Sequence, residues 1–261
     1  MKIGIRNGSM GFPDMTELFP QVAEIGFDGV ELDIRAEYEN EPVLSSYERA
    51  QIGALSEETG VEVPSLCIGA LWKYSPAAVD DALLDTARHL LTASIQAAAD
   101  LGAQWILVPV TPAEEEISHE ECTARWMREM AGVAHGAEEA GVMLCLENVG
   151  RGCGKSAEEL RTIAEGADSP AVAVYYDIGN ATAFGNDPVA EIHDLADLIA
   201  VVHVKDREAD LLGEGIVDIP ACLQALHEIG YDDWLILETP PTDDPMQAGR
   251  HNLQYLRDLV S

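Results

Sequence analysis

The sequence is poor in positive charge. Of its 261 residues, 15 are Lys or Arg and 47 are Asp or Glu, so the formal net charge is −32. Such an excess of negative charge repels nucleic acids and anionic membrane surfaces at ordinary salt, and we expect neither as a partner. The sequence also lacks any uncharged apolar run of about 18 residues, so no membrane-spanning helix is predicted.

Cysteines are few and show no paired spacing. There are five, without a Cys-x-x-Cys motif, so we expect neither disulfides nor a cysteine metal site. Residues 1–6 have the pattern of a strand and not of a secretory signal, which favours a cytoplasmic location. The acidic residues are spread along predicted helices, a pattern typical of halophilic proteins. The alternative is an ordinary acidic cytosolic protein.

Apolar material is plentiful and periodic. Hydrophobic residues make up 47% of the chain, and eight short apolar runs recur, most of them followed by a helical pattern that ends at Gly. This repeat predicts a (β/α)₈ TIM barrel in a single domain over residues 1–261, because such barrels need about 250 residues. A doubly wound sheet with extra strands is the alternative. The expected strands are residues 2–6, 29–34, 61–68, 105–110, 142–147, 172–177, 199–204 and 234–238.

The last four of these runs carry metal-binding side chains at or near their ends. The active sites of such barrels lie at the C-terminal ends of the strands, so we expect these side chains to converge. Three carboxylates and one imidazole suit Mn²⁺, Mg²⁺, Co²⁺ or Zn²⁺. A single acidic residue after a strand would mean little in so acidic a chain, but four candidates in register favour one divalent metal site. The four are Glu147, Asp177, His203 and Glu238.

The sequence around these residues resembles that of the xylose isomerase-like barrels. The resemblance covers nearly the whole chain, and within this group it looks closest to the L-ribulose-5-phosphate 3-epimerases and ketose 3-epimerases. The motifs that carry it are Leu146-Glu147-Asn148, Tyr176-Asp177-Ile178-Gly179-Asn180, His203-Val204-Lys205-Asp206 and Leu237-Glu238-Thr239.

The resemblance implies a metal-dependent isomerase or epimerase of a sugar or sugar phosphate, with manganese among the candidate ions. It implies that Glu147 and Glu238 transfer protons on opposite faces of a metal-bound enediolate. Many relatives carry His where this chain has Asn180, which can still hydrogen-bond a sugar hydroxyl. Relatives often form dimers or tetramers, so a homo-oligomer is compatible with the resemblance.

Charged residues after the fifth and seventh runs are candidates for substrate binding. Arg151, Lys205, Asp206 and Arg207 could bind a phosphate or sugar hydroxyls, with a solvated loop as the equally weighted alternative. Residues Arg6 and Glu31, on the first two runs, could also face the pocket.

The same residues bear on four other functions. An inosose dehydratase-like lyase could use the same metal site, and an inactive sugar-binding barrel is a further alternative. A three-metal nuclease would need more strand histidines than His203 alone. The Gly-rich segment 150–156 is not a phosphate-binding P-loop, because Val149 stands where the first Gly would be.

Overall fold

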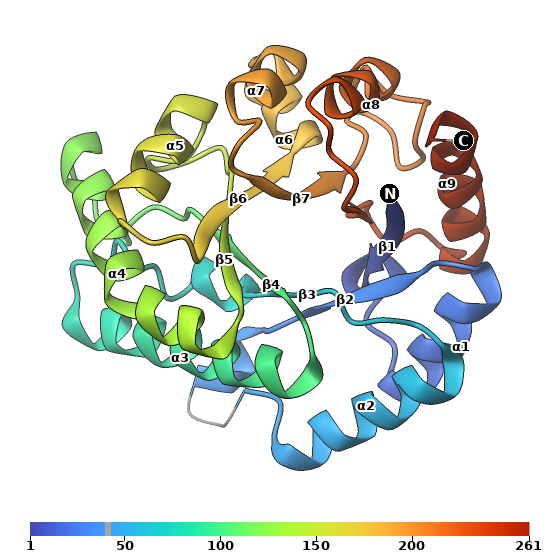
Figure 1. Cartoon of the computed structure of the whole chain (residues 1–261), viewed down its shortest axis with the longest axis horizontal. Helices are drawn as coiled ribbons and strands as arrows, with labels where there is room; N and C mark the ends of the chain where they lie inside the picture. Colours follow the sequence, from blue (N-terminus) through green and yellow to red (C-terminus); the bar gives the residue numbers. More distant parts are fainter. Residues whose placement is uncertain (40–42, 261) are drawn as a thin grey trace.

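Eight parallel strands form a closed barrel in chain order, with β8 hydrogen-bonded to β1 (Figure 1). The computed structural model describes residues 1–39 and 43–260. Closure confirms the expected (β/α)₈ TIM barrel and is incompatible with an open doubly wound sheet. The strands are β1 (Lys2–Arg6), β2 (Gly29–Asp33), β3 (Ser65–Cys67), β4 (Trp105–Pro109), β5 (Met143–Glu147), β6 (Val172–Asp177), β7 (Ile199–Val204) and β8 (Trp234–Leu237).

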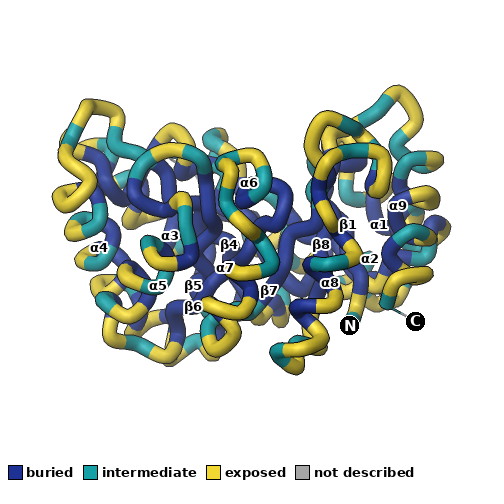
Figure 2. The backbone as a smooth tube through the Cα atoms, turned by 90° about the horizontal axis from the view of Figure 1, so that it is seen from above, coloured by how far each residue is buried: buried dark blue, intermediate teal, exposed yellow. Residues whose placement is uncertain are grey.

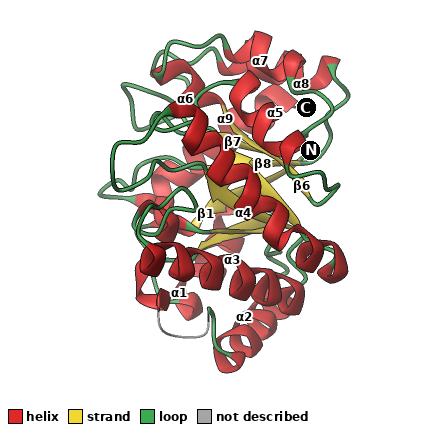
Figure 3. Ribbon diagram, turned by 90° about the vertical axis from the view of Figure 1, so that its left-hand side faces the viewer, coloured by secondary structure: helices red, strands yellow, loops and turns green. Residues whose placement is uncertain are grey.

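Helices surround the ring of strands, as Figure 3 shows. None of the described helices is long and apolar enough to cross a membrane. Short 3₁₀ turns follow β1, β2 and β3, namely η1 (Asn7–Met10), η2 (Ala36–Glu39) and η3 (Gly69–Trp72). The α-helices are α1 (Met15–Ile25), α2 (Ser46–Thr59), α3 (Asp81–Leu101), α4 (His119–Ala140), α5 (Ala157–Gly166), α6 (Ile178–Ala183), α7 (Pro188–Asp194), α8 (Ile219–Glu228) and α9 (Pro245–Val260).

Local signals in the sequence set where these helices end. Gly26 and Gly102 follow α1 and α3 in the left-handed region, with φ of 101° and 73°, which residues with a side chain rarely adopt. The third strand is shorter than expected, covering residues 65–67 and not 61–68. Pro64 precedes it and has no N–H to donate, and residues 61–63 contribute only an isolated bridge between Glu62 and Gly29.

Alternate residues of each strand face the barrel interior, and the others face the helices. The interior holds a small apolar cluster that includes Cys145, Tyr175 and Val201. A much larger apolar layer separates the strands from the helices, so the backbone of the strands is buried on both faces (Figure 2). Since side chains alternate with period two, the residues two positions after this cluster also point inward at the C-terminal end. They are Glu147, Asp177 and His203.

Candidate metal centre

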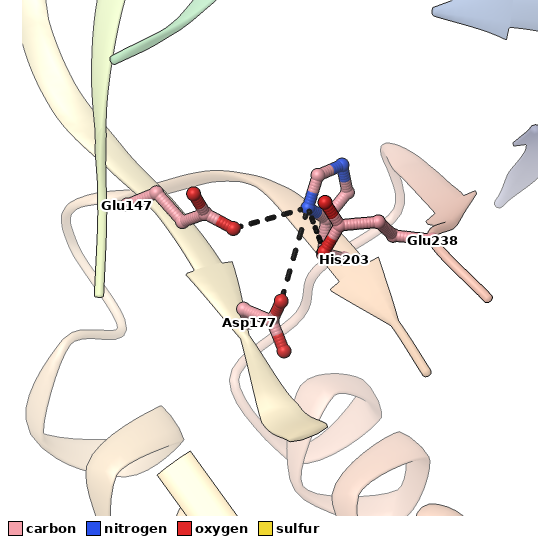
Figure 4. Close-up of side chains that lie close together, drawn as sticks. All are labelled: Glu147, Asp177, His203 and Glu238. Atoms are coloured by element: carbon pink, nitrogen blue, oxygen red, sulfur yellow. Dashed lines mark hydrogen bonds and ion pairs between the residues drawn. The ribbon is translucent and has the colours of Figure 1, made fainter. Parts of the chain in front are cut away.

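Four side chains converge at the C-terminal end of the barrel, one from the end of each of β5 to β8. Each offers a donor atom within 4.8 Å of the donors of the other three. Figure 4 shows the three carboxylates directed at one nitrogen of the imidazole. Register contributes to this, because Asp177 lies directly opposite His203 in the pairing of β6 with β7. The structure therefore brings together the four residues for which the sequence predicts one metal site, Glu147, Asp177, His203 and Glu238.

The imidazole of His203 lies at the centre of this cluster and is fully buried. Its Nδ1 is 3.3 Å from Oε1 of Glu147, 3.5 Å from Oε2 of Glu238 and 3.9 Å from Oδ2 of Asp177. The carboxylate of Asp177 is also fully buried. Three carboxylates and an imidazole nitrogen that share one small volume fit a divalent cation.

Two cationic side chains form ion pairs with carboxylates of this cluster. The ammonium of Lys205 is 2.6 Å from Oδ2 of Asp177 as an ion pair, and it also donates a hydrogen bond to Glu238. Arg6 on β1 bridges Glu238 and Asp33, with its Nη2 3.1 Å from Oδ2 of Asp33. Glu238 is thus paired with two cations, whereas the imidazole is the one basic group that contacts Glu147 among the residues that the structure describes.

This difference gives the two glutamates different acidities. Burial, with the charges of Glu238 and Asp177, raises the pKa of Glu147 to about 7, although the contact with His203 opposes the shift. For Glu238, burial also acts to raise the pKa, but Lys205, His203 and Arg6 outweigh it and hold the pKa below its usual range. Glu147 is therefore the weaker acid of the two glutamates, and Glu238 is the stronger.

An amide side chain aligns the two strand ends that carry Glu147 and Asp177. The Nδ2 of Asn148 donates to the backbone carbonyl of Asp177 at 2.9 Å, and its Oδ1 accepts from the backbone N–H of Asp177 at 2.8 Å. Asn148 belongs to the motif Leu146-Glu147-Asn148, but the sequence alone does not predict a role for its side chain. Its function in the fold depends on strand register, which the sequence pattern does not reveal.

A cavity of about 310 Å³ opens beside the cluster. Glu147 and Glu238 both line it, together with Asn180 and Arg151, two of the expected substrate-binding residues. The guanidinium of Arg151 stacks over the ring of Trp72 at 5.6 Å, so these two side chains form part of the wall. A larger hollow of about 830 Å³ lies at the opposite, N-terminal end of the strands, away from the four converging residues.

Two other expected substrate-binding residues, Asp206 and Arg207, are not among the residues lining this cavity. The carboxylate of Asp206 is buried and accepts four backbone N–H groups of the loop 207–217, whereas Arg207 is exposed. Their contact with a substrate stays a prediction.

The two residues that the sequence only suggested as pocket-facing, Arg6 and Glu31, do point into the barrel. Both are engaged with members of the cluster, Arg6 with Glu238 and Glu31 with His203.

Comparison with known proteins places this fold and site in a family. Residues 19–259 match the model of the xylose isomerase-like TIM barrel family. Because the match covers most of the chain, the protein belongs to this family.

Curated and structural relatives agree with the assignment. A putative L-ribulose-5-phosphate 3-epimerase of Escherichia coli K12 is 30% identical over 226 residues, 82% of this chain and 79% of the relative. The crystal structure of 3-keto-D-glucoside 4-epimerase from E. coli superposes with a TM-score of 0.85 at 23% identity, covering 99% of both chains. A structure of the IolI protein with a zinc atom gives 0.82 at 18% identity, covering 100% of this chain and 98% of that one. At these identities the two structures show the fold alone.

Proposed function

We propose that this protein is a divalent-metal-dependent epimerase or isomerase of a sugar or sugar phosphate. The observation that carries the proposal is the placement of two carboxylates, Glu147 from β5 and Glu238 from β8, on one cavity with His203 between them (Figure 4). Epimerisation needs two proton-transfer groups that reach the same carbon from different sides. The relative in E. coli K12, by its name a putative L-ribulose-5-phosphate 3-epimerase, supports a ketose phosphate as a substrate to test first.

The four converging side chains would hold the metal ion, with Nδ1 as the donor atom of His203. The candidates are Mn²⁺, Mg²⁺, Co²⁺ and Zn²⁺, since all accept oxygen and imidazole ligands. When bound, such an ion polarises a substrate carbonyl and makes the neighbouring C–H more acidic.

The side chains of the chain itself then move the proton. One of the two glutamates removes it from the carbon beside the carbonyl, and the other returns a proton to the opposite face, so the configuration of that carbon inverts. Return of the proton to the adjacent carbon would interconvert an aldose and a ketose instead. Within the cavity, the amide of Asn180 and the guanidinium of Arg151 supply hydrogen-bond donors for hydroxyl or phosphate oxygens.

Incorporation of solvent deuterium tests this proposal directly. The protein is incubated in D₂O with a panel of ketoses and ketose phosphates, with Mn²⁺ or with a chelator, at low and at high salt. We expect metal-dependent exchange at one carbon, and the position of that carbon distinguishes an epimerase from an isomerase. Exchange that survives the chelator, or no exchange with folded and metal-loaded protein, would contradict the proposal. Loss of water from the product would assign the site to a lyase.

A further inference from the structure

Glu31 is a buried carboxylate that the proposed proton transfers do not use. It lies on β2, points into the barrel and has no exposed surface. Its position is on the far side of the His203 ring from the metal cluster, because Glu31 faces Nε2 while the other three carboxylates face Nδ1. A charged group in the interior of a barrel is costly unless it is fully hydrogen-bonded, so its partners indicate what it does.

Each oxygen of Glu31 has a separate set of partners. Oε2 accepts hydrogen bonds from the hydroxyls of Ser65 and Tyr175, both at 2.7 Å. Oε1 is 3.0 Å from Nε2 of His203. The ring of Tyr175 also packs edge-on against the imidazole, with 4.5 Å between ring centroids. Ser65 and Tyr175 thus fix the carboxylate, and the carboxylate in turn faces one nitrogen of the imidazole.

The chemistry of this contact determines where the imidazole carries its proton. The hydroxyls of Ser65 and Tyr175 both donate to Glu31, and hydrogen-bond donors of this kind favour the ionised form of a carboxyl group. An ionised carboxylate can only accept, so the hydrogen at Nε2 is the one that is donated. A neutral imidazole with its hydrogen on Nε2 presents a lone pair at Nδ1.

We propose that Glu31 is a positioning residue that holds His203 as the Nε2–H tautomer and aims Nδ1 at the metal site. This inference rests on the proposed function, in which His203 is a metal ligand. In such carboxylate–imidazole–metal arrangements, loss of the outer partner typically weakens metal binding about 10- to 100-fold.

The affinity for Zn²⁺, measured by competition with a chromophoric chelator, tests the inference without relying on activity. We expect Glu31→Gln to bind Zn²⁺ about 10- to 100-fold more weakly than the wild type. Glu191→Gln is the matched control, because Glu191 is also buried and accepts a hydrogen bond from the hydroxyl of Tyr176 at 2.7 Å. Tyr176 lies on the face of β6 that points away from the barrel interior, so this pair is separate from the metal cluster. We expect this control to keep wild-type affinity, and circular dichroism checks that both variants are folded.

His203→Ala separates a failure of this inference from a failure of the proposed function. If His203→Ala binds Zn²⁺ as tightly as the wild type, the metal centre itself is wrong. If His203→Ala loses affinity and Glu31→Gln does not, only the role of Glu31 is overturned. Equal losses in Glu31→Gln and Glu191→Gln would also overturn it, because they would reflect general destabilisation.

Nitrogen-15 NMR of the Zn²⁺-loaded wild type gives a readout that does not depend on whether a variant folds. We expect the His203 imidazole to show a protonated Nε2 and a metal-coordinated Nδ1. Coordination through Nε2 would refute the inference.

Discussion

Replacement of Asp206 by Asn should destabilise the protein through the loop that follows β7. Oδ1 of Asp206 accepts the backbone N–H groups of Arg207 and Val217, and Oδ2 accepts those of Gly213 and Gly215, at 2.8–3.1 Å. An Asn side chain has one oxygen, so in either orientation its amino group faces two of these four donors. Two hydrogen bonds to a charged acceptor are then lost, at about 1.5 kcal/mol each, and we expect a loss of about 3 kcal/mol.

Thermal unfolding followed by circular dichroism measures this loss. For a chain of this size, the expected change corresponds to a decrease in melting temperature of about 6–12 °C. Asp218→Asn is the control, because Asp218 accepts the N–H of Ala221 at the start of α8 and Asn caps a helix equally well. If Asp206→Asn melts at the same temperature as Asp218→Asn, the four hydrogen bonds do not stabilise the loop.

Three further predictions concern the site, an ion pair between α3 and α4, and the surface. Glu238→Gln should keep the fold but slow deuterium exchange into the substrate by at least about 100-fold, and unchanged exchange would remove Glu238 from the chemistry. Glu129→Gln should lose about 1–2 kcal/mol in urea unfolding at neutral pH, because Arg88 donates to both oxygens of Glu129. Burial acts to raise the pKa of Glu129, but the hydrogen bonds of Arg88 and Arg128 hold it below 4.5. The stabilisation by this pair therefore exists above pH 4.5 and should vanish as the pH falls through the lowered pKa. A difference in stability that does not change with pH would contradict the ion-pair explanation. Molar KCl should raise the melting temperature, because the net charge of −32 makes the surface repel itself; a melting temperature indifferent to salt would refute the halophile interpretation.

The parts of the site that the sequence predicted are those set by strand periodicity. Each of three site residues lies two positions after an inward-facing apolar residue of its strand, namely Glu147, Asp177 and His203. Because the strands are parallel and the barrel is closed, inward-facing side chains at their C-terminal ends lie close together. The parts that the sequence did not predict depend on contacts between distant strands. Glu31 meets His203 across 172 positions, and Arg6 meets Glu238 across 232, so their partners follow from barrel closure and stagger and not from any local pattern.

Asp206 shows a second limit of the sequence. Its carboxylate follows the strand that carries His203, a position that suits a substrate-binding group and equally suits a group that organises the loop. Only the folded path of residues 207–217, which turns back at Gly213 with a φ of 83°, distinguishes these uses. A side chain at Gly215 would collide with the carbonyl of Arg207 and the carboxylate of Asp206, so glycine at this position reflects how closely the loop wraps that carboxylate.

The charges in the C-terminal half of the barrel explain why the site suits a cation of charge two. Five carboxylates share this volume with three basic side chains, and most are paired: Arg6 bridges Asp33 and Glu238, Lys205 bridges Asp177 and Glu238, and Glu31 holds His203. Glu147 is the carboxylate with the least compensation, and its pKa is correspondingly raised to about 7. A divalent cation at Nδ1 of His203 would supply the positive charge that Glu147 lacks and would oppose its protonation. The same shortage of positive charge that raises the pKa of Glu147 would therefore favour a divalent ion at this cluster.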